Sequence, residues 1–416
     1  MEANKKAPST RKLVIFDVEG VILPKNRFVF EAGRRMGFRR LIRILAAGLM
    51  YQAGLLNLKK TLQTIYGTLR GLTVTQAEAI ADAICPMPGA HEALAQLKQQ
   101  GCVIAFVSSG LPTFIVKRLA QRFNVDYAFG IDVDLDSEVF TGNIQGDVIE
   151  SEGKKRVLMR ILKKEGLQPN QCAVVADDRN NLPLFLPETR KIGFNPDFLV
   201  KAKADVAISD ELDTVPNAVN ASTTPRRRLT ANKLARETVH AAGALVPAIT
   251  MLIGTPLMVY LTLTVSGLYA ASELLRLSGN GLPVIRSITR CSALPTEHCD
   301  FVAAPLYFAA GILLTLVLYR PPANYAAIAA FAFGDSAASI IGGQITNKPL
   351  PFNKSKTPEG TAAEFAFAFV GAAFFVPPQL ALAAAATATA IELLPLPVND
   401  NITMPLAAGL TLTMLL

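Results

Sequence analysis

The second half of this sequence consists mainly of long apolar segments, whereas the first half does not. Up to about residue 215 the chain has the mixed charge and alternating pattern of a soluble α/β protein. From about residue 240 onward charges are sparse, and apolar runs approach the length of membrane-spanning helices. The sequence therefore predicts two unlike domains, 1–215 and 236–416, joined by a basic linker over 216–235.

The apolar half is expected to be an all-α, polytopic membrane domain with about seven transmembrane helices. The window 240–275 is long enough for two spans, with a break near Gly254-Thr255-Pro256. The other candidate spans are 302–319, 323–343, 361–377, 379–394 and 402–416.

Basic residues predict the orientation of these spans. The segment PRRRLTANKLAR at 225–236 directly precedes the first span and should face anionic lipid in the cytoplasm. Alternation then places the loops 276–300, 344–360 and 395–401 on the same side. We therefore expect an integral, multi-pass membrane protein whose first domain and active-site loops are cytoplasmic. The net charge is +8, but no aromatic interleaving accompanies the basic residues, so nucleic acid is not an expected partner.

A polar cluster interrupts the apolar half in FGDSAASIIGGQITNKPLPFNKSKTPEGT, residues 333–361. Charges inside or beside spans are costly and are usually functional. A carboxylate such as Asp335 suits a divalent cation, glycines allow the backbone to approach phosphates, and lysines neutralise phosphate charge. Helix-end residues that reach the membrane interface are the alternative, and this alternative is favoured for Lys348 alone.

Five segments of this half resemble, in order, the dolichol kinase and phytol kinase family, which is related to the CDP-diacylglycerol synthases. The matching segments are Arg236-Glu237-x-x-His240 with Gly243, SELLRL at 272–277, FGDSAASIIGG at 333–343, KSKTPEGT at 354–361, and Glu392 followed by NDNITMPL at 399–406. The loop QITNKPLPFN departs from the family, whose members usually have a longer glycine-bearing loop there.

The resemblance implies a CTP-dependent kinase of a polyprenol or other isoprenoid-type lipid alcohol, with CTP and Mg²⁺ at the cytoplasmic loops and the lipid tail in the bilayer. Asp335 would be catalytic and would hold the metal. The residues implied to bind nucleotide or phosphate are Arg236, His240, Gly334, Ser336, Ser339, Lys354, Lys356, Thr357, Glu359, Gly360, Thr361, Asp400 and Asn401. The alternative is a cytidylyltransferase, which attacks the α-phosphate of CTP rather than the γ-phosphate.

Three apolar strands of the first half each end in polar residues. RKLVIFDVEG leads to Asp17, CVIAFVSSG leads to Ser108, and QCAVVADD leads to Asp177 and Asp178. Helical segments alternate with these strands, notably 89–101 and 153–166, so we expect a parallel, doubly wound, Rossmann-like sheet. Ligands bind at the carboxyl ends of the strands in such sheets, and the polar residues should therefore meet in one pocket.

This constellation resembles the haloacid dehalogenase (HAD)-type phosphatases, most closely the phosphoserine phosphatase-like branch, over about residues 11–212. The resemblance implies Asp17 as nucleophile and Glu19 as general acid and base. Ser108 and Lys154 would hold the phosphoryl group. Mg²⁺ would be held by Asp17, the backbone carbonyl of Glu19, Asp177 and Asn181. The helical insertion at about 25–85 stands where this branch carries its cap.

Two departures keep a second interpretation open for this half. The family's second aspartate is Glu19 here, and the neutral Asn181 stands where an acidic residue usually supports the metal. The alternative to an active phosphatase is a silent, regulatory HAD domain. The segment FRRLIRILAAGLMYQAGLL at 38–56 is basic and then apolar, so it either packs on the core or meets a membrane or a lipid tail.

The expected function of the whole chain is a bifunctional lipid-phosphate enzyme. One domain would phosphorylate a lipid alcohol with CTP, and the other would hydrolyse a phosphate ester, such as a lipid phosphate, with Mg²⁺. A homodimer is a possible assembly. The competing hypotheses are a kinase with a silent soluble domain and a transporter or scaffold built from both folds.

Overall fold

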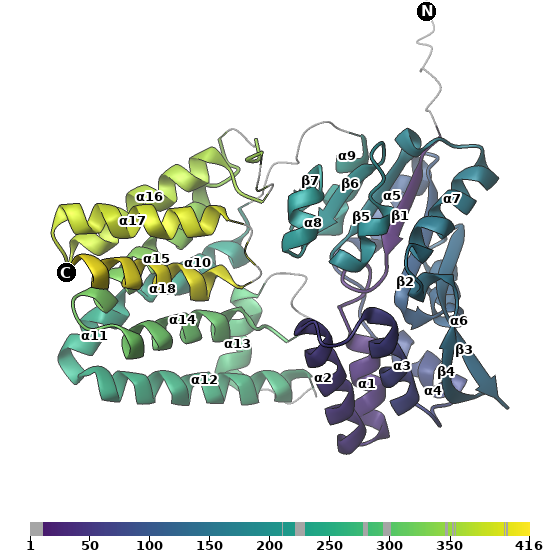
Figure 1. Ribbon diagram of the computed structural model, residues 1–416, viewed down its shortest axis with the longest axis horizontal. Helices are drawn as coiled ribbons and strands as arrows, with labels where there is room; N and C mark the ends of the chain where they lie inside the picture. Colours follow the sequence, from purple (N-terminus) through teal and green to yellow (C-terminus); the bar gives the residue numbers. More distant parts are fainter. Residues whose placement is uncertain are drawn as a thin grey trace, which may run out of the picture. The chain divides into compact units, whose positions relative to one another are not determined.

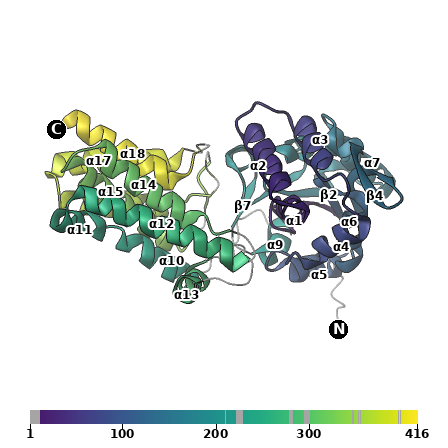
Figure 2. The same ribbon diagram turned by 90° about the horizontal axis from the view of Figure 1, so that it is seen from below.

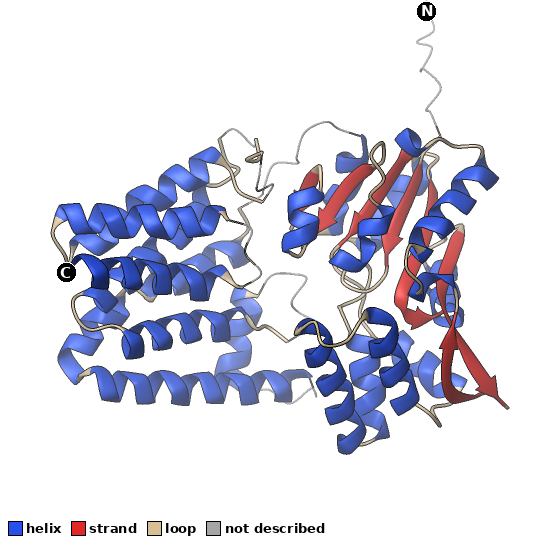
Figure 3. Ribbon diagram, viewed as in Figure 1, coloured by secondary structure: helices blue, strands red, loops and turns tan. Residues whose placement is uncertain are grey.

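The computed structural model divides the chain into two compact units, Met1–Ser222 and Thr223–Leu416. It describes residues 11–209, 211–220, 229–277, 282–293, 301–345, 348–351, 353, 355–394, 396 and 398–416. The division between the units lies within the expected linker at 216–235. Figure 3 shows strands in the first unit, while the described elements of the second unit are helices.

The first unit is built on a seven-stranded sheet with the order β4-β3-β2-β1-β5-β6-β7. Its strands are β1 Leu13–Asp17, β2 Val103–Pro112, β3 Tyr127–Asp136, β4 Val139–Gln145, β5 Cys172–Ala176, β6 Arg190–Phe194 and β7 Val206–Ile208. Only the β3–β4 pair is antiparallel. The expected Rossmann-like sheet is confirmed, and the β3–β4 pair extends one edge of it.

Buried apolar runs explain why β1 and β5 lie at the centre of this sheet. Every residue of both strands is buried, as is typical of parallel strands covered on both faces. Helices α5 (Ala90–Gln99) and α6 (Thr113–Arg122) cover one face, and α7 (Gly153–Glu165) and α8 (Phe198–Lys203) cover the other, as right-handed crossovers require (Figure 1). This arrangement brings the carboxyl ends of β1, β2 and β5 to one edge.

A helical cap is inserted between β1 and α5. It comprises α1 Arg27–Met36, α2 Phe38–Gln52, α3 Leu58–Thr68 and α4 Val74–Ala83. The cap is tied to the sheet by Tyr66 of α3, which is fully buried and donates a 2.7 Å hydrogen bond from its hydroxyl to the carbonyl of Gly110. The cap therefore covers the edge at which the polar residues of β1 and β2 end.

The second unit is a bundle of helices, seen from a second side in Figure 2. They are α10 Ala231–Ala242, α11 Leu245–Ile253, α12 Thr255–Leu277, α13 Pro283–Ser292, α14 Ala304–Leu318, α15 Ala323–Ile341, α16 Pro358–Ala373, α17 Pro378–Leu393 and α18 Asp400–Leu415. Most of α15 is buried, and it packs against α10, α14, α16, α17 and α18.

Small residues allow these helices to approach closely. A Cβ atom on Gly371 of α16 would lie 2.5 Å from the carbonyl oxygen of Ala329 on α15, and one on Gly311 of α14 would lie 1.9 Å from that of Asn401. Such contacts between small residues are typical of helices packed in membranes. Contacts with α10, α14, α16, α17 and α18 place α15, which carries Asp335, at the centre of the bundle.

Among the described residues, one helix is long and apolar enough to span a membrane, Thr255–Arg276. Helices α16, α17 and α18 have 16 residues each. At about 1.5 Å per residue they reach roughly 24 Å, less than the bilayer core of about 30 Å. The helical character of the second half is confirmed, but the expectation of about seven spans in a multi-pass protein is not confirmed.

The helix boundaries also differ from the prediction at two points: α13 lies within the loop expected at 276–300, and the first predicted span is divided. The break near Gly254 is present, because Gly254 ends α11 with a φ of 83°. The predicted segment before it is interrupted again at Gly243 and Ala244, which separate the amphipathic α10 from the nine-residue α11. A Cβ on Gly243 would lie 2.4 Å from Phe308, so close packing against α14 accompanies this break.

Candidate functional site

Asp17 ends the central strand of the first unit, and both of its carboxylate oxygens are engaged. Its Oδ1 accepts a hydrogen bond from the backbone N–H of Val18 at 2.9 Å and lies 3.3 Å from Nζ of Lys154. Its Oδ2 accepts a 2.6 Å hydrogen bond from Nδ2 of Asn181. The carboxylate is 6% exposed and is therefore held in one orientation by groups from three separate elements.

Lys154 and Asn181 form a connected pair behind Asp17. Lys154 stands in the first turn of α7, is 3% exposed, and donates a 2.6 Å hydrogen bond to Oδ1 of Asn181. The family resemblance implies a role for Lys154, and the structure brings Lys154 to Asp17. Asn181, expected to help hold a metal, instead uses its amide nitrogen on Asp17 and its amide oxygen on Lys154, so its metal role stays a prediction.

Ser108 comes to the same edge from β2. Its Oγ accepts hydrogen bonds from the backbone N–H groups of Gly110 at 3.2 Å and Leu111 at 3.1 Å, and the residue is fully buried. Because both of these contacts use the oxygen as acceptor, the hydroxyl proton is available to a phosphoryl oxygen. This arrangement suits the predicted phosphate-holding role.

Glu19 occupies space that a glycine leaves open. A Cβ atom on Gly110 would lie 1.5 Å from Oε2 of Glu19, so any larger residue at 110 would displace this carboxylate. Burial, with the charge of Asp17 adding to it, raises the pKa of Glu19 to about 8. A carboxyl group that keeps its proton near neutral pH is suited to act as a general acid.

Three carboxylates gather beside Glu19. Ligand oxygens of Asp17, Asp177 and Asp178 lie within 4.8 Å of one another. Lys25 places its Nζ 2.7 Å from Oδ2 of Asp177 and 2.7 Å from Oδ2 of Asp178. Burial raises the pKa of Asp177 well above its ordinary value, and the charge of Asp178 adds to this shift. Burial also acts to raise the pKa of Asp178, but the charge of Lys25 holds the pKa of Asp178 below its ordinary value.

The acidic cluster fits a magnesium ion. Oδ1 of Asp177 is buried without a hydrogen-bond partner, and an unmet buried carboxylate oxygen is costly unless a cation satisfies it. Carboxylate oxygens are the donors that Mg²⁺ prefers. Gly20 contributes room, because a Cβ at its φ of 87° would lie 2.2 Å from Oδ2 of Asp177. The predicted ligands Asp17 and Asp177 therefore fit this ion.

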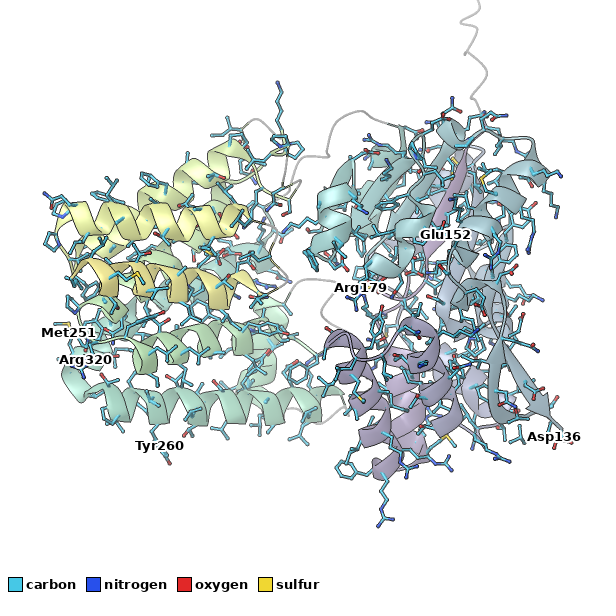
Figure 4. The ribbon with its side chains drawn as sticks, in the orientation of Figure 1. Asp136, Glu152, Arg179, Met251, Tyr260 and Arg320 are labelled. Carbon is cyan, nitrogen blue, oxygen red and sulfur yellow. The ribbon has the colours of Figure 1, made fainter. Side chains whose placement is uncertain are left out.

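The cap contacts the segment that follows Asp178. Tyr51, at the end of α2, donates a 2.6 Å hydrogen bond to Oδ1 of Asn180, and the guanidinium of Arg179 lies 4.7 Å from the centre of the Tyr51 ring. Figure 4 labels Arg179, which lies between the cap helices and the end of the sheet. Arg179, which the sequence did not indicate as functional, is therefore a contact between cap and core.

In the second unit, two predicted residues come together from separate helices. Nδ1 of His240 on α10 lies 3.3 Å from Oδ2 of Asp335 on α15. The His240 ring is stacked on Phe308 of α14, with ring centres 4.4 Å apart. Residues 95 positions apart in the sequence thus share one site.

The predicted lysine motif lies at the start of α16. Lys356 forms ion pairs with Glu392 and, at 3.7 Å, with Asp400, so two of the matched sequence segments meet there. Oγ1 of Thr357 accepts hydrogen bonds from the backbone N–H groups of Gly343 at 3.2 Å and Gly360 at 3.3 Å. The motif therefore packs against the end of the α15 segment.

The remaining predicted residues are only partly placed. Glu359 accepts a 3.1 Å hydrogen bond from the N–H of Gly343, and Thr361 donates one to the carbonyl of Thr357 at 3.1 Å. Gly334 packs on Glu364 and Ala368 of α16. Lys354 lies outside the described residues. The nucleotide- and phosphate-binding roles of all these residues stay predictions, including those of Arg236, Ser336, Ser339 and Asn401.

Several residues of the first site were not identified from the sequence as functional. Lys25 follows the β1 turn in VILPKN and resembles any surface lysine. Asp178 was given no role of its own, and Gly110 was not singled out. The run Asp177-Asp178 at a strand end was the available signal for Asp178. No local signal indicates Lys25, because its partners lie more than 150 positions away.

Comparison with known proteins bears on the first unit. Residues 11–185 match the family model of the haloacid dehalogenase-like hydrolases. Phosphoserine phosphatase of Methanocaldococcus jannaschii is 28% identical over 198 residues, which cover 48% of this chain and 92% of the relative. Phosphoserine phosphatase of Archaeoglobus fulgidus is 29% identical over 201 residues, which cover 48% of this chain and 57% of the relative.

Among solved structures, a phospho-aspartyl intermediate analogue of phosphoserine phosphatase is 27% identical, covers 48% of this chain and 93% of its own, and has a TM-score of 0.44. The residues matched by the family model all lie within Met1–Ser222. The N-terminal unit, rather than the whole chain, is therefore similar in sequence to the haloacid dehalogenase-like hydrolases and the phosphoserine phosphatases.

Proposed function

We propose that the first unit hydrolyses phosphate monoesters with Asp17 as the nucleophile. The observation that supports this proposal best is the carboxylate of Asp17, which ends the central strand and is oriented by Lys154, Asn181 and the N–H of Val18. Such an anchored carboxylate can attack phosphorus without rearrangement. The names of the relatives make phosphoserine one candidate substrate.

Each side chain of the site has a role in this reaction. Asp17 attacks phosphorus while Glu19 gives its proton to the departing ester oxygen. Glu19 then removes a proton from the water that releases phosphate from Asp17. Lys154 and the hydroxyl of Ser108 bind phosphoryl oxygens. Mg²⁺, held by Asp17 and Asp177 when bound, would neutralise phosphoryl charge.

The change Asp17→Asn tests this proposal. Purified full-length chain is assayed with Mg²⁺ and p-nitrophenyl phosphate, and the variant should lose at least about 1,000-fold in kcat because the nucleophile is removed. Asp147→Asn is the matched control, because Asp147 forms an exposed ion pair with Arg160 at 2.6 Å. If the parent hydrolyses no phosphate ester, or if Asp17→Asn hydrolyses it as fast, the first unit is a silent domain.

We further propose that the phosphate ester is presented at an anionic membrane surface. Helix α2 of the cap exposes Phe38, Ile42, Leu45 and Leu49, with exposed fractions of 74, 48, 47 and 70%. These residues recur at helical spacing and form one apolar stripe. Exposed Arg39 and Arg43 lie beside it. An apolar stripe beside cations is the pattern of helices that lie in a lipid interface.

For the second unit we propose CTP-dependent phosphorylation of an isoprenoid-type lipid alcohol. The support is that segments far apart in the chain converge. His240 contacts Asp335, and Lys356 forms ion pairs with Glu392 and Asp400. Carboxylates and a lysine in one place suit a metal–nucleotide complex. A cytidylyltransferase is the alternative for the same site.

Labelled CTP distinguishes these two reactions. The full chain is incubated with a divalent cation, isoprenoid alcohols and CTP labelled at the γ- or the α-phosphate. Kinase activity transfers γ-label to the lipid, whereas transfer of α-label onto a lipid phosphate selects the cytidylyltransferase. If neither label reaches lipid, both proposals for the second unit are wrong.

A further inference from the structure

A second group of potential metal ligands lies in the helical unit. Glu237 and His240 stand one turn apart on α10, so their side chains share a face of that helix. Asp335 lies on α15, against which α10 packs. Potential ligand atoms of Glu237, His240 and Asp335 all lie within 4.8 Å of one another. The imidazole distinguishes this group from the three carboxylates of the first unit.

One carboxylate oxygen of Glu237 is buried without a hydrogen-bond partner. The residue is 5% exposed, and this oxygen is its Oε2. A second carboxylate, that of Asp335, lies in the same group. Burial of a carboxylate next to another carboxylate is unfavourable unless a positive charge satisfies both. The charges of His240, Arg236 and Lys233 act on Glu237, but its Oε2 accepts no hydrogen bond and is open to a bound cation.

The neighbouring residues hold this group in a fixed geometry. The ring of Phe308 is stacked on His240 at an angle of 23° between their planes. Gly243 makes room for Phe308, because a Cβ at that position would lie 2.4 Å from its ring. The sequence Glu-x-x-His-x-x-Gly on α10 thus supplies two potential ligands and the space for the ring that supports one of them. A preformed ligand set lowers the cost of ordering on binding.

We propose that Glu237, His240 and Asp335 bind a divalent first-row transition-metal ion, such as Mn²⁺. Two carboxylates and one imidazole form a mixed oxygen and nitrogen set. Mg²⁺ prefers oxygen ligands alone, whereas imidazole suits the transition metals. This inference deepens the nucleotide site proposed for the second unit and assigns Glu237 to it. It also changes the role of His240 from a phosphate-binding residue to a metal ligand.

Pulsed electron paramagnetic resonance with Mn²⁺ tests this proposal directly. The full chain carries Asp17→Asn and Asp177→Asn, which remove ligands of the first site, and is stripped of metal before Mn²⁺ alone is added. We expect one tightly bound Mn²⁺ with a ¹⁴N coupling from an imidazole. His240→Gln should remove the coupling, and Glu237→Gln should weaken Mn²⁺ binding at least about tenfold, or about 1.4 kcal/mol.

Glu273→Gln is the matched control. Glu273 is a fully buried carboxylate of the same unit whose two oxygens already accept hydrogen bonds from Arg276 at 2.9 Å. Its replacement should leave Mn²⁺ affinity and the ¹⁴N coupling unchanged. Thermal unfolding provides a second measurement. Without metal, Glu237→Gln should unfold at the same or a higher temperature than the parent, because it removes an unsatisfied buried charge, and it should lose the stabilisation by Mn²⁺.

Two results would overturn the metal site. One is the absence of tight Mn²⁺ binding in this background, and the other is a ¹⁴N coupling that persists in His240→Gln. The proposed kinase can fail separately. Nitrogen-coupled Mn²⁺ without transfer of γ-label from CTP would retain the metal site and exclude the kinase. Transfer of γ-label supported by Mg²⁺, with no Mn²⁺ bound by these residues, would retain the kinase and exclude the metal site.

Discussion

At the residue scale, Gly110 is expected to control the position of the general acid. Glu19 is one methylene longer than an aspartate, and its carboxylate occupies the space where a Cβ on Gly110 would stand. Gly110→Ala should therefore displace Glu19 and reduce kcat for a phosphate ester about 100-fold, the usual effect of misplacing a catalytic group by about 1 Å. Steady-state kinetics with p-nitrophenyl phosphate measures this loss.

A second change that restores activity would show that Gly110→Ala acts by displacing Glu19 rather than by damaging the fold. Glu19→Asp shortens the side chain and should recover part of the activity lost in Gly110→Ala, although the same change alone should lower activity. Gly67→Ala is the control, because a Cβ at this glycine meets no atom within 4 Å. An additive loss in the double variant would contradict the steric explanation.

A second prediction concerns Lys25 as a competitor of the metal ion. Its ammonium contacts Asp177 and Asp178, two members of the acidic cluster that fits Mg²⁺. The lysine side chain is 43% exposed, so screening limits its effect to about 1 kcal/mol. Lys25→Met should lower the Mg²⁺ concentration for half-maximal hydrolysis about fivefold.

Titration of activity with Mg²⁺ provides the measurement for this prediction. Lys59→Met is the matched control, since Lys59 pairs with Glu150 on the surface at 2.6 Å and should leave the Mg²⁺ requirement unchanged. If Lys25→Met instead raises KM for the ester at saturating Mg²⁺, Lys25 binds phosphate rather than competing with the cation.

Strand-end positions explain which residues of the first site could be predicted. Asp17, Ser108 and Asp177 each follow an apolar run of the sequence, and neighbouring parallel strands bring such positions to one edge, so their meeting follows from the sequence pattern. Lys154 and the role of Glu19 came from a family resemblance. Lys25 could not be predicted, because its position depends on a turn that returns the chain to Asp177.

At the scale of elements, the apolar stripe of α2 is expected to bring the cap to lipid. Ile42→Glu with Leu49→Glu places charges on two exposed positions without touching the core. Burial of such side chains contributes about 1.5 to 3 kcal/mol each. The pair should therefore lower hydrolysis of a long-chain phosphate ester in anionic vesicles at least about tenfold and leave hydrolysis of its short-chain, soluble form unchanged.

A single comparison decides whether the stripe has this role. Met159→Glu changes another exposed apolar residue, on α7, and is the control for added charge, because it is 47% exposed and lies outside the cap. Equal losses on the soluble and the vesicle-bound ester would indicate damage to the active site. Full activity of the double variant on vesicles would exclude lipid contact by α2.

Helix boundaries in the second unit were predicted unevenly. The segments from 302 onward agree with α14 to α18 within a few residues, because glycine and proline separate them. Apolar composition did not reveal the break at Gly243, since residues on both sides of it are apolar or small. Nor did it indicate α13, whose residues were expected to form a loop. Length decides membrane spanning, and by length and composition only α12 qualifies among the described helices.

At the scale of the whole molecule, each unit has its own hydrophobic core and its own cluster of ionisable residues. The sheet and cap of the first unit surround Asp17, and the helices of the second unit surround Asp335. Groups that share no interaction partner usually contribute additively. The two proposed reactions should therefore respond independently to changes at these two aspartates.

Measurement of both reactions on the same preparations tests this independence. Asp17→Asn should remove hydrolysis of the soluble ester and leave transfer of γ-label from CTP to the lipid alcohol within about twofold of the parent, because independent sites add within a few tenths of a kcal/mol. Asp335→Asn should remove transfer of γ-label to the lipid alcohol and leave hydrolysis of the soluble ester unchanged. A loss of both reactions in either single variant would mean that the two sites are coupled. If each variant loses only one reaction, one chain carries two separate phosphoryl-transfer sites of opposite direction, and they can be assigned different substrates.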